Sequence, residues 1–206
     1  TPGGVSVQPS PTLPLNGNFT WRDDFKSAEL SPAWIMLRTP KTTWWNLAEG
    51  KIRLTPSTNV LSGRANPSFL GRRVQHSRFT ASLAVDVPSE PGVSAGLAVF
   101  QGERFYYYAN VQRATNGITL SLERFRGRDG SGPEVAKTVS LPGAKSVQLR
   151  VTANDAKCSF DYAADSGGWE SLVADQDATL LTTDVAGGFV GATVGPHARL
   201  EAARET

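Results

Sequence analysis

Apolar and polar residues alternate most clearly between positions 79 and 87 of the chain. The residues that share the apolar face are Phe79, Ala81, Leu83, Val85 and Val87. A period of two residues predicts a strand with one buried face. The same pattern predicts further strands over residues 96–100, 105–112, 118–125, 135–141, 147–153, 157–162 and 188–194.

Turn-forming residues separate these runs. Asn116-Gly117 and the Asp-Ser-Gly-Gly segment at 165–168 predict hairpin turns. The only helical signal, over residues 27–30, is too short to shape the fold. Many short strands without a long helix predict an all-β protein, a β-sandwich of two antiparallel sheets.

Residues 1–18 differ from the rest of the chain because they lack periodicity and hold four prolines. This composition predicts an extended linker, and residues 19–206 then form one β-sandwich domain. The chain begins at Thr1 and shows no signal peptide, so we expect it to be cut from a longer protein.

The composition narrows the possible functions. The 206 residues include 21 Lys and Arg against 19 Asp and Glu, a net charge of +2. This charge is too small to attract nucleic acid or an anionic membrane, so neither is expected as a partner. The single cysteine, Cys158, excludes an internal disulfide and a multi-cysteine metal site. It alternates with Phe160 and Tyr162, which predicts a buried, unreactive thiol.

Groups for catalysis or metal binding are scattered. A glycosidase needs two carboxylates across a cleft, but Asp23 and Asp24 would point to opposite faces of a strand. A nucleophilic Ser or Cys needs a histidine base, and the two histidines lie far apart without a Gly-x-Ser-x-Gly motif. Calcium could bind Asp175 and Asp177, although a solvated turn is the more ordinary interpretation. We therefore expect no cofactor and no enzymatic activity from this chain alone.

An aromatic and amide face is the first candidate for ligand binding. In the run 105–112, Tyr107, Ala109 and Val111 form the apolar set and are expected to face the core. The opposite face then presents Tyr106, Tyr108, Asn110 and Gln112. Rings that stack on sugar C–H groups, together with amides that pair with hydroxyls, are typical of a carbohydrate platform. Contact with another domain and a plain solvent-exposed strand face are the alternatives.

The run 69–76 adds charged groups to this picture. If Val74 faces the core, Arg73 and Gln75 face outward and join the platform. Arg72 and His76 then point inward as structural residues. A buried arginine must be paired, and Asp24 or Asp86 is the expected partner.

Tryptophans provide a third element. Trp45 shares a face with Leu47, so Trp45 is expected in the core and Trp44 on the surface, where it contacts ligand. The alternative is that Trp44 is the core residue. We expect Trp169 in the core and Trp34 in a packing role.

Several segments together resemble a known family, in the same order and spacing from about residue 19 to residue 195. They are Asp23-Asp24-Phe25, Trp34 with Arg38 and Pro40, residues 50–54, residues 66–76 (Asn-Pro-Ser-Phe-Leu-Gly-Arg-Arg-Val-Gln-His), residues 95–100, the tyrosine strand and residues 187–195. The sequence resembles the concanavalin A-like C-terminal module of glycoside hydrolase family 43 β-xylosidases and arabinofuranosidases, carbohydrate-binding module family 91. It departs from that pattern at Val74, and it ends without the family's last strand, so we expect a truncated C-terminal edge.

The resemblance implies a concanavalin A-like jelly roll that follows a catalytic propeller. It implies a non-catalytic module for β-1,4-xylan or xylo-oligosaccharides, in a parent that is a β-xylosidase or arabinofuranosidase and is expected to be secreted. The main alternative is a structural accessory domain that packs on the catalytic propeller and completes its substrate site. A free-standing sandwich enzyme is the third hypothesis.

Overall fold

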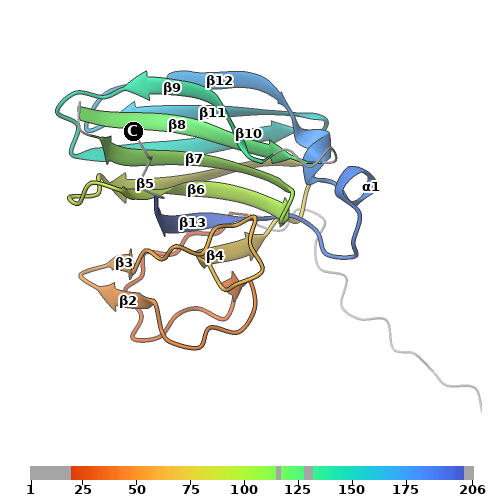
Figure 1. The fold of residues 1–206 in the computed structure, drawn as a ribbon, viewed down its shortest axis with the longest axis horizontal. Helices are drawn as coiled ribbons and strands as arrows, with labels where there is room; N and C mark the ends of the chain where they lie inside the picture. The colour runs from red at the N-terminus through yellow and green to blue at the C-terminus, as the bar shows by residue number, and fades with distance from the viewer. Residues whose placement is uncertain (1–19, 115–116, 128–131, 202–206) are drawn as a thin grey trace, which may run out of the picture.

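The computed structural model describes residues 20–114, 117–127 and 132–201. Within these residues, two antiparallel sheets lie face to face, one in front of the other in Figure 1. This arrangement confirms the predicted all-β sandwich. No helix among the described residues is long and apolar enough to span a membrane.

The larger sheet has seven strands. In spatial order they are β1 (Ile35–Met36), β4 (Ser68–Arg73), β13 (Thr193–Leu200), β6 (Val93–Gly102), β7 (Phe105–Ala114), β8 (Gly117–Arg126) and β9 (Glu134–Ser140). The smaller sheet has four strands, β12 (Glu170–Asp177), β11 (Lys157–Ala164), β10 (Ser146–Asn154) and β5 (Arg78–Asp86). A separate hairpin of β2 (Trp45–Ala48) and β3 (Lys51–Leu54) lies beside β4 in Figure 1.

The main core fills the space between the two sheets. Alternate residues of the strands point into it, including Tyr107, Leu149 and Phe160, which are all fully buried. Cys158 is buried among them, as predicted, and burial raises the pKa of its thiol to about 12. The thiol is therefore protonated and unreactive at neutral pH.

A second buried cluster lies on the other face of the seven-stranded sheet. Its members are Leu61, Phe69, Ala98, Phe100, Tyr106, Tyr108 and Phe125. Leu61 belongs to the connection between β3 and β4, and Leu37, just after β1, also packs on this cluster. The segment from β1 to β4 therefore covers part of this sheet face, which hides residues that would otherwise be exposed.

Two predicted elements differ from the structure. The strand predicted over 188–194 begins only at Thr193 and continues to Leu200, because Gly187 and Gly188 have φ values of 77° and 83° and interrupt the extended chain. The helical signal over 27–30 gives bends, whereas two short helices, η1 (Ala178–Leu181) and α1 (Thr183–Ala186), follow β12 without having been predicted.

The turns and termini complete the comparison. The predicted turn at 165–168 joins β11 to β12, and the Asp165 carboxylate accepts hydrogen bonds from the backbone N–H groups of Lys145 and Ser146. Gly117 opens β8 with a φ of 123°, while Asn116 lies outside the described residues. The predicted linker and the last five residues also lie outside them. The strand that contains Gly195 runs on to Leu200 and sits inside the sheet, between β4 and β6.

Candidate functional site

The predicted platform on β7 has the expected parity but is not exposed. Tyr107, Ala109 and Val111 face the main core, and Tyr106 and Tyr108 face the opposite side, as alternation requires. Both Tyr106 and Tyr108 are fully buried, Asn110 is 4% exposed and Gln112 is half-buried. The prediction of an exposed platform is therefore wrong, because the segment from β1 to β4 packs over this sheet face.

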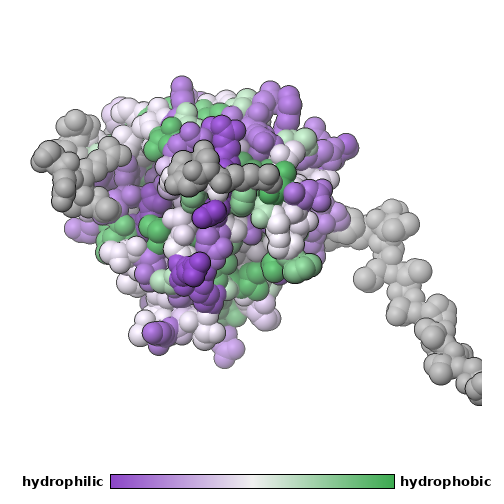
Figure 2. Space-filling view, turned by 45° about the vertical axis from the view of Figure 1, so that its right-hand side comes forward, coloured by the Kyte–Doolittle hydropathy of each residue, from purple (hydrophilic) through white to green (hydrophobic). Residues whose placement is uncertain are grey.

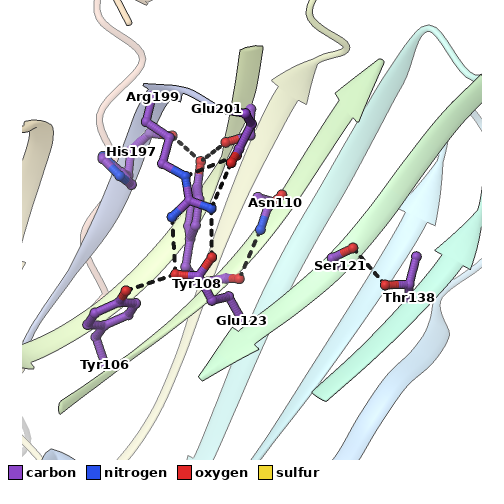
Figure 3. A network of polar contacts seen from close by, with 10 residues as sticks. Tyr106, Tyr108, Asn110, Ser121, Glu123, Thr138, His197, Arg199 and Glu201 are labelled. Carbon is purple, nitrogen blue, oxygen red and sulfur yellow. Dashed lines mark hydrogen bonds and ion pairs between the residues drawn. The ribbon is translucent and has the colours of Figure 1, made fainter. Parts of the chain in front are cut away.

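A buried ion pair lies beside Tyr106 (Figure 3). Arg199 donates from Nη1 to Glu123 Oε1 (3.1 Å) and from Nη2 to Glu123 Oε2 (2.6 Å). The hydroxyl of Tyr106 also donates to Glu123 Oε1, over 2.8 Å. Glu201 accepts two further hydrogen bonds from the same guanidinium, over 3.0 and 3.2 Å. The two carboxylates thus compensate the positive charge of Arg199, and the phenol of Tyr106 adds a hydrogen bond to the carboxylate of Glu123, which would otherwise be costly to bury.

Tyr108 and His197 continue this network into the sheet. The Tyr108 hydroxyl donates to the His197 carbonyl (3.2 Å) and lies 3.3 Å from the Ser94 hydroxyl. Burial raises the pKa values of Tyr106 and Tyr108 above the usual tyrosine range, so both remain neutral phenols. A sugar cannot reach either ring while the second cluster is closed, and their contacts show a structural role.

His197 is neutral for the same physical reason. Its Nδ1 lies 3.0 Å from the carbonyl of Ser68, which can only accept, so Nδ1 carries the proton. Burial lowers the pKa of His197 to about 3. Its Nε2 is buried and makes no hydrogen bond to any described residue.

The tryptophan pair at the start of β2, Trp44 and Trp45, has the reverse of the predicted orientation. Trp44 is only 8% exposed, and its indole N–H donates to Asn66 Oδ1 over 2.7 Å. Asn66 in turn donates to the carbonyl of Leu37, over 2.7 Å. Trp45, predicted in the core, is half-buried and meets Trp44 edge to face. Trp44 is therefore a packing residue, because β2 begins only at Trp45 and alternation does not extend back to Trp44.

Arg73 and Gln75 are exposed, as predicted. Arg72 is half-buried, but it forms no ion pair with either expected carboxylate: its guanidinium stacks 4.0 Å from the centre of the Trp21 ring. Asp24 pairs with Arg22 and Asp86 pairs with Lys51.

His76, predicted to point inward, is exposed, because β4 ends at Arg73 and alternation does not continue to it.

The sequence predicts buried or packing roles for two other tryptophans. Trp34 packs as predicted: its ring stacks with Phe25, and its indole N–H donates to Asp23 Oδ2 over 2.8 Å. Trp169, predicted in the core, is 42% exposed, and the guanidinium of Arg150 lies 4.1 Å from its ring centre. It follows two glycines, so the chain can turn away from the core before β12 begins.

Sequence reasoning missed the exposed apolar residues between α1 and β13. Phe189 and Val190 are fully and 55% exposed, in a loop of residues 187–192 that we call the Phe189 loop. The only sequence signal was an apolar pair flanked by glycines. Figure 1 shows this loop at one end of the sandwich, between α1 and β13. On the face shown in Figure 2, hydrophobic residues form small patches separated by hydrophilic ones.

The Phe189 loop is held by hydrogen bonds to two of its carbonyl groups. Gln101 donates from Nε2 to the carbonyl of Val190 over 2.7 Å, and the Val74 N–H donates to the carbonyl of Ala192 over 2.9 Å. Arg73 lies beside Gly191, since a Cβ built there would be 3.9 Å from its Nη1. The loop and Arg73 together form the candidate functional site.

Acidic residues that could act in catalysis or metal binding have other partners. Asp175 lies 3.5 Å from the ammonium of Lys157, and Asp177 caps η1 by accepting from the N–H of Thr179. Asp23 accepts from the backbone N–H of Phe25 as well as from Trp34. Among the described residues, no group of three His, Cys, Asp or Glu side chains could hold a metal ion.

Comparisons with known proteins agree with the β-sandwich fold described above. A family model described as the β-xylosidase C-terminal concanavalin A-like domain matches residues 22–203. The non-reducing end alpha-L-arabinofuranosidase BoGH43B of Bacteroides ovatus is 28% identical over 180 residues, which cover 86% of this chain and 33% of that protein.

Solved structures give the same result. A GH43_12 protein retrieved from the capybara gut metagenome has a TM-score of 0.83 at 28% identity, with 89% of this chain and 35% of that chain covered. A xylan beta-1,4-xylosidase from Bacillus halodurans shares the fold, with a TM-score of 0.78 at 21% identity over 95% of this chain and 39% of its own. The chain thus spans roughly a third of the length of the proteins it matches.

Proposed function

The chain belongs to the family of β-xylosidase C-terminal concanavalin A-like domains, and we propose that its Phe189 loop packs on a family 43 catalytic domain next to bound substrate. As a member of this family it is an accessory C-terminal domain of glycoside hydrolases. Beyond this family role, the Phe189 loop is the surface that contacts the catalytic domain, and the contact lies next to the substrate.

The observation that carries this proposal is the exposure of Phe189. A fully exposed phenyl ring contributes nothing to the stability of the isolated fold, and its loop is fixed by hydrogen bonds to the carbonyls of Val190 and Ala192. Exposed apolar groups on a fixed loop favour contact with another surface. The relatives have about twice this chain's length outside the matched region, which leaves room for that surface.

Recognition of xylan or xylo-oligosaccharides is the second candidate function. It is supported by the exposed side chains of Arg73 and Gln75, two of the residues that the sequence predicts as ligand contacts. Arg73 lies beside the Phe189 loop, so a ring and a hydrogen-bond donor are available to the same sugar. In this proposal the oligosaccharide is held jointly with the catalytic domain, and the chain supplies no catalytic carboxylate.

A kinetic comparison in the full-length enzyme tests the proposal. Phe189→Ala should lower kcat/KM for xylo-oligosaccharides or arabinosides about tenfold, because a buried aromatic contact of about 1.4 kcal/mol is lost. Val135→Ala is the matched control, since Val135 is also exposed, at 58%, but lies on the edge strand β9. Equal kcat/KM values for Phe189→Ala and the parent would contradict a role beside the substrate.

A further inference from the structure

We propose that the outer face of the four-stranded sheet, next to Trp169, binds neutral pyranose oligosaccharides. This surface is separate from the Phe189 loop: Trp169 directly precedes β12, whereas the loop follows the helices that come after the other end of β12. The inference shares a ligand class with the proposed function but depends on different residues.

The Trp169 ring is exposed and held in place. Arg150 stacks its guanidinium 4.1 Å from the ring centre, and Asp161 fixes that guanidinium through hydrogen bonds of 3.1 and 3.0 Å. One face of the indole is thus covered by Arg150, while the residue as a whole remains 42% exposed. A ligand can stack on the other face, and because the ring is already held in place, the side chain loses little further conformational freedom on binding.

The indole lies over the sheet rather than beyond its edge. Arg150 points outward from β10, because it alternates with the core residues Leu149 and Val151. Strand β11 lies between β10 and β12, so a ring that reaches Arg150 from the start of β12 crosses β11. Ala163, an outward-facing residue of β11, is only 2% exposed, as expected if the indole covers it.

The charges on this sheet face neutralise one another. Each outward-facing cation lies against a carboxylate, in the pairs Arg150–Asp161, Arg78–Asp155, Lys157–Asp175 and, at the end of β5, Lys51–Asp86. Between these pairs the exposed outward-facing side chains of β5 and β10 are uncharged, and apart from Ala84 they are polar: Thr80, Ser82, Gln148 and Thr152. A surface of this kind gives no net attraction to an anion or a cation and offers hydroxyl and amide groups instead.

A neutral pyranose chain has the complementary chemistry. The apolar C–H face of one sugar ring can stack on the free face of Trp169, and its equatorial hydroxyls can pair with polar side chains such as Gln148. A flat sheet face suits an extended chain, because successive sugars can lie along it without entering a pocket.

The test is a binding titration of the 206-residue chain with xylohexaose, cellohexaose and mannohexaose. Calorimetry and tryptophan fluorescence measure the binding. The chain should bind at least one of these neutral hexasaccharides, and Trp169→Ala should weaken that binding about tenfold. Gln148→Ala should weaken hexasaccharide binding about threefold. Because Gln148 is exposed, this variant tests the proposal even if Trp169→Ala does not fold.

Trp21→Ala is the matched control. Trp21 is 37% exposed and also carries a stacked guanidinium, that of Arg72 at 4.0 Å, but its ring meets the edge of Trp34 and does not lie over this sheet. Binding should be unchanged in this variant. The proposal is overturned if no neutral hexasaccharide binds, or if Trp169→Ala and Gln148→Ala both bind like the parent.

Discussion

At the scale of single residues, the imidazole of His197 couples folding to pH. Its pKa falls from 6.5 to about 3 in the folded chain, because the buried ring cannot be hydrated when charged. Below pH 6.5 the imidazole of His197 becomes protonated in the unfolded chain but stays neutral in the folded chain. The free energy of unfolding therefore decreases as pH falls towards 3, by up to about 1.4 kcal/mol per pH unit from this residue.

Replacement of His197 by Gln isolates this contribution. The amide does not titrate and can still donate to the carbonyl of Ser68, so His197→Gln should show a smaller loss of stability between pH 6.5 and 4.5 than the parent. Urea unfolding at several pH values measures the two slopes. Parallel slopes would mean that the folded imidazole takes up protons as readily as the unfolded one.

Prediction from alternation succeeded for the direction of the β7 side chains and failed for the exposure of their outer face. Alternation correctly placed Tyr107 and Tyr106 on opposite faces of β7, because the strand fixes side-chain direction locally. It could not show that Leu61, far away in sequence, covers Tyr106. The same limit explains Arg72, whose partner is the ring of Trp21 rather than a carboxylate.

At the scale of elements, the close contact of β6 with β7 depends on a glycine. A Cβ at Gly96 would lie 1.9 Å from the carbonyl oxygen of Ala109 and 2.7 Å from Cα of Asn110, so it would push the strands apart. Gly96→Ala should therefore destabilise the fold by about 3 kcal/mol in urea unfolding. Gly102→Ala is the control on the same strand, since a Cβ there meets nothing within 4 Å, and it should change stability by less than about 0.5 kcal/mol. Similar losses for both variants would show that backbone contact at Gly96 is not the cause.

Strand positions were the most predictable elements. The long runs that became β5 and β10 each bury one face, so their period of two is visible in sequence. Strand β13 was predicted too early, because the apolar residues Phe189 and Val190 imitate a strand although they face solvent. Apolar residues that serve an external contact cannot be distinguished from core residues by alternation alone.

At the scale of the whole molecule, several of the described carboxylates hold the strands and turns together. Glu123 is buried against Arg199, and Asp161 holds Arg150. Hydrogen bonds from Arg78 lower the pKa of Asp155, and those from backbone N–H groups lower the pKa of Asp165. A glycosidase instead needs one carboxyl group with a raised pKa, separated from a second carboxylate by about 5 to 9.5 Å across an open cleft.

We therefore expect the 206-residue chain, purified alone, to release no nitrophenol from nitrophenyl xylosides or arabinosides. The physical reason is that protonating these carboxylates to act as acids would break ion pairs or caps on which the strands depend. A full-length relative with its catalytic domain is the positive control. The variant Glu123→Gln tests whether any activity comes from this chain itself. Release that scales with chain concentration, persists through repurification and disappears in Glu123→Gln would show that the buried pair opens to substrate and that this domain is itself a hydrolase.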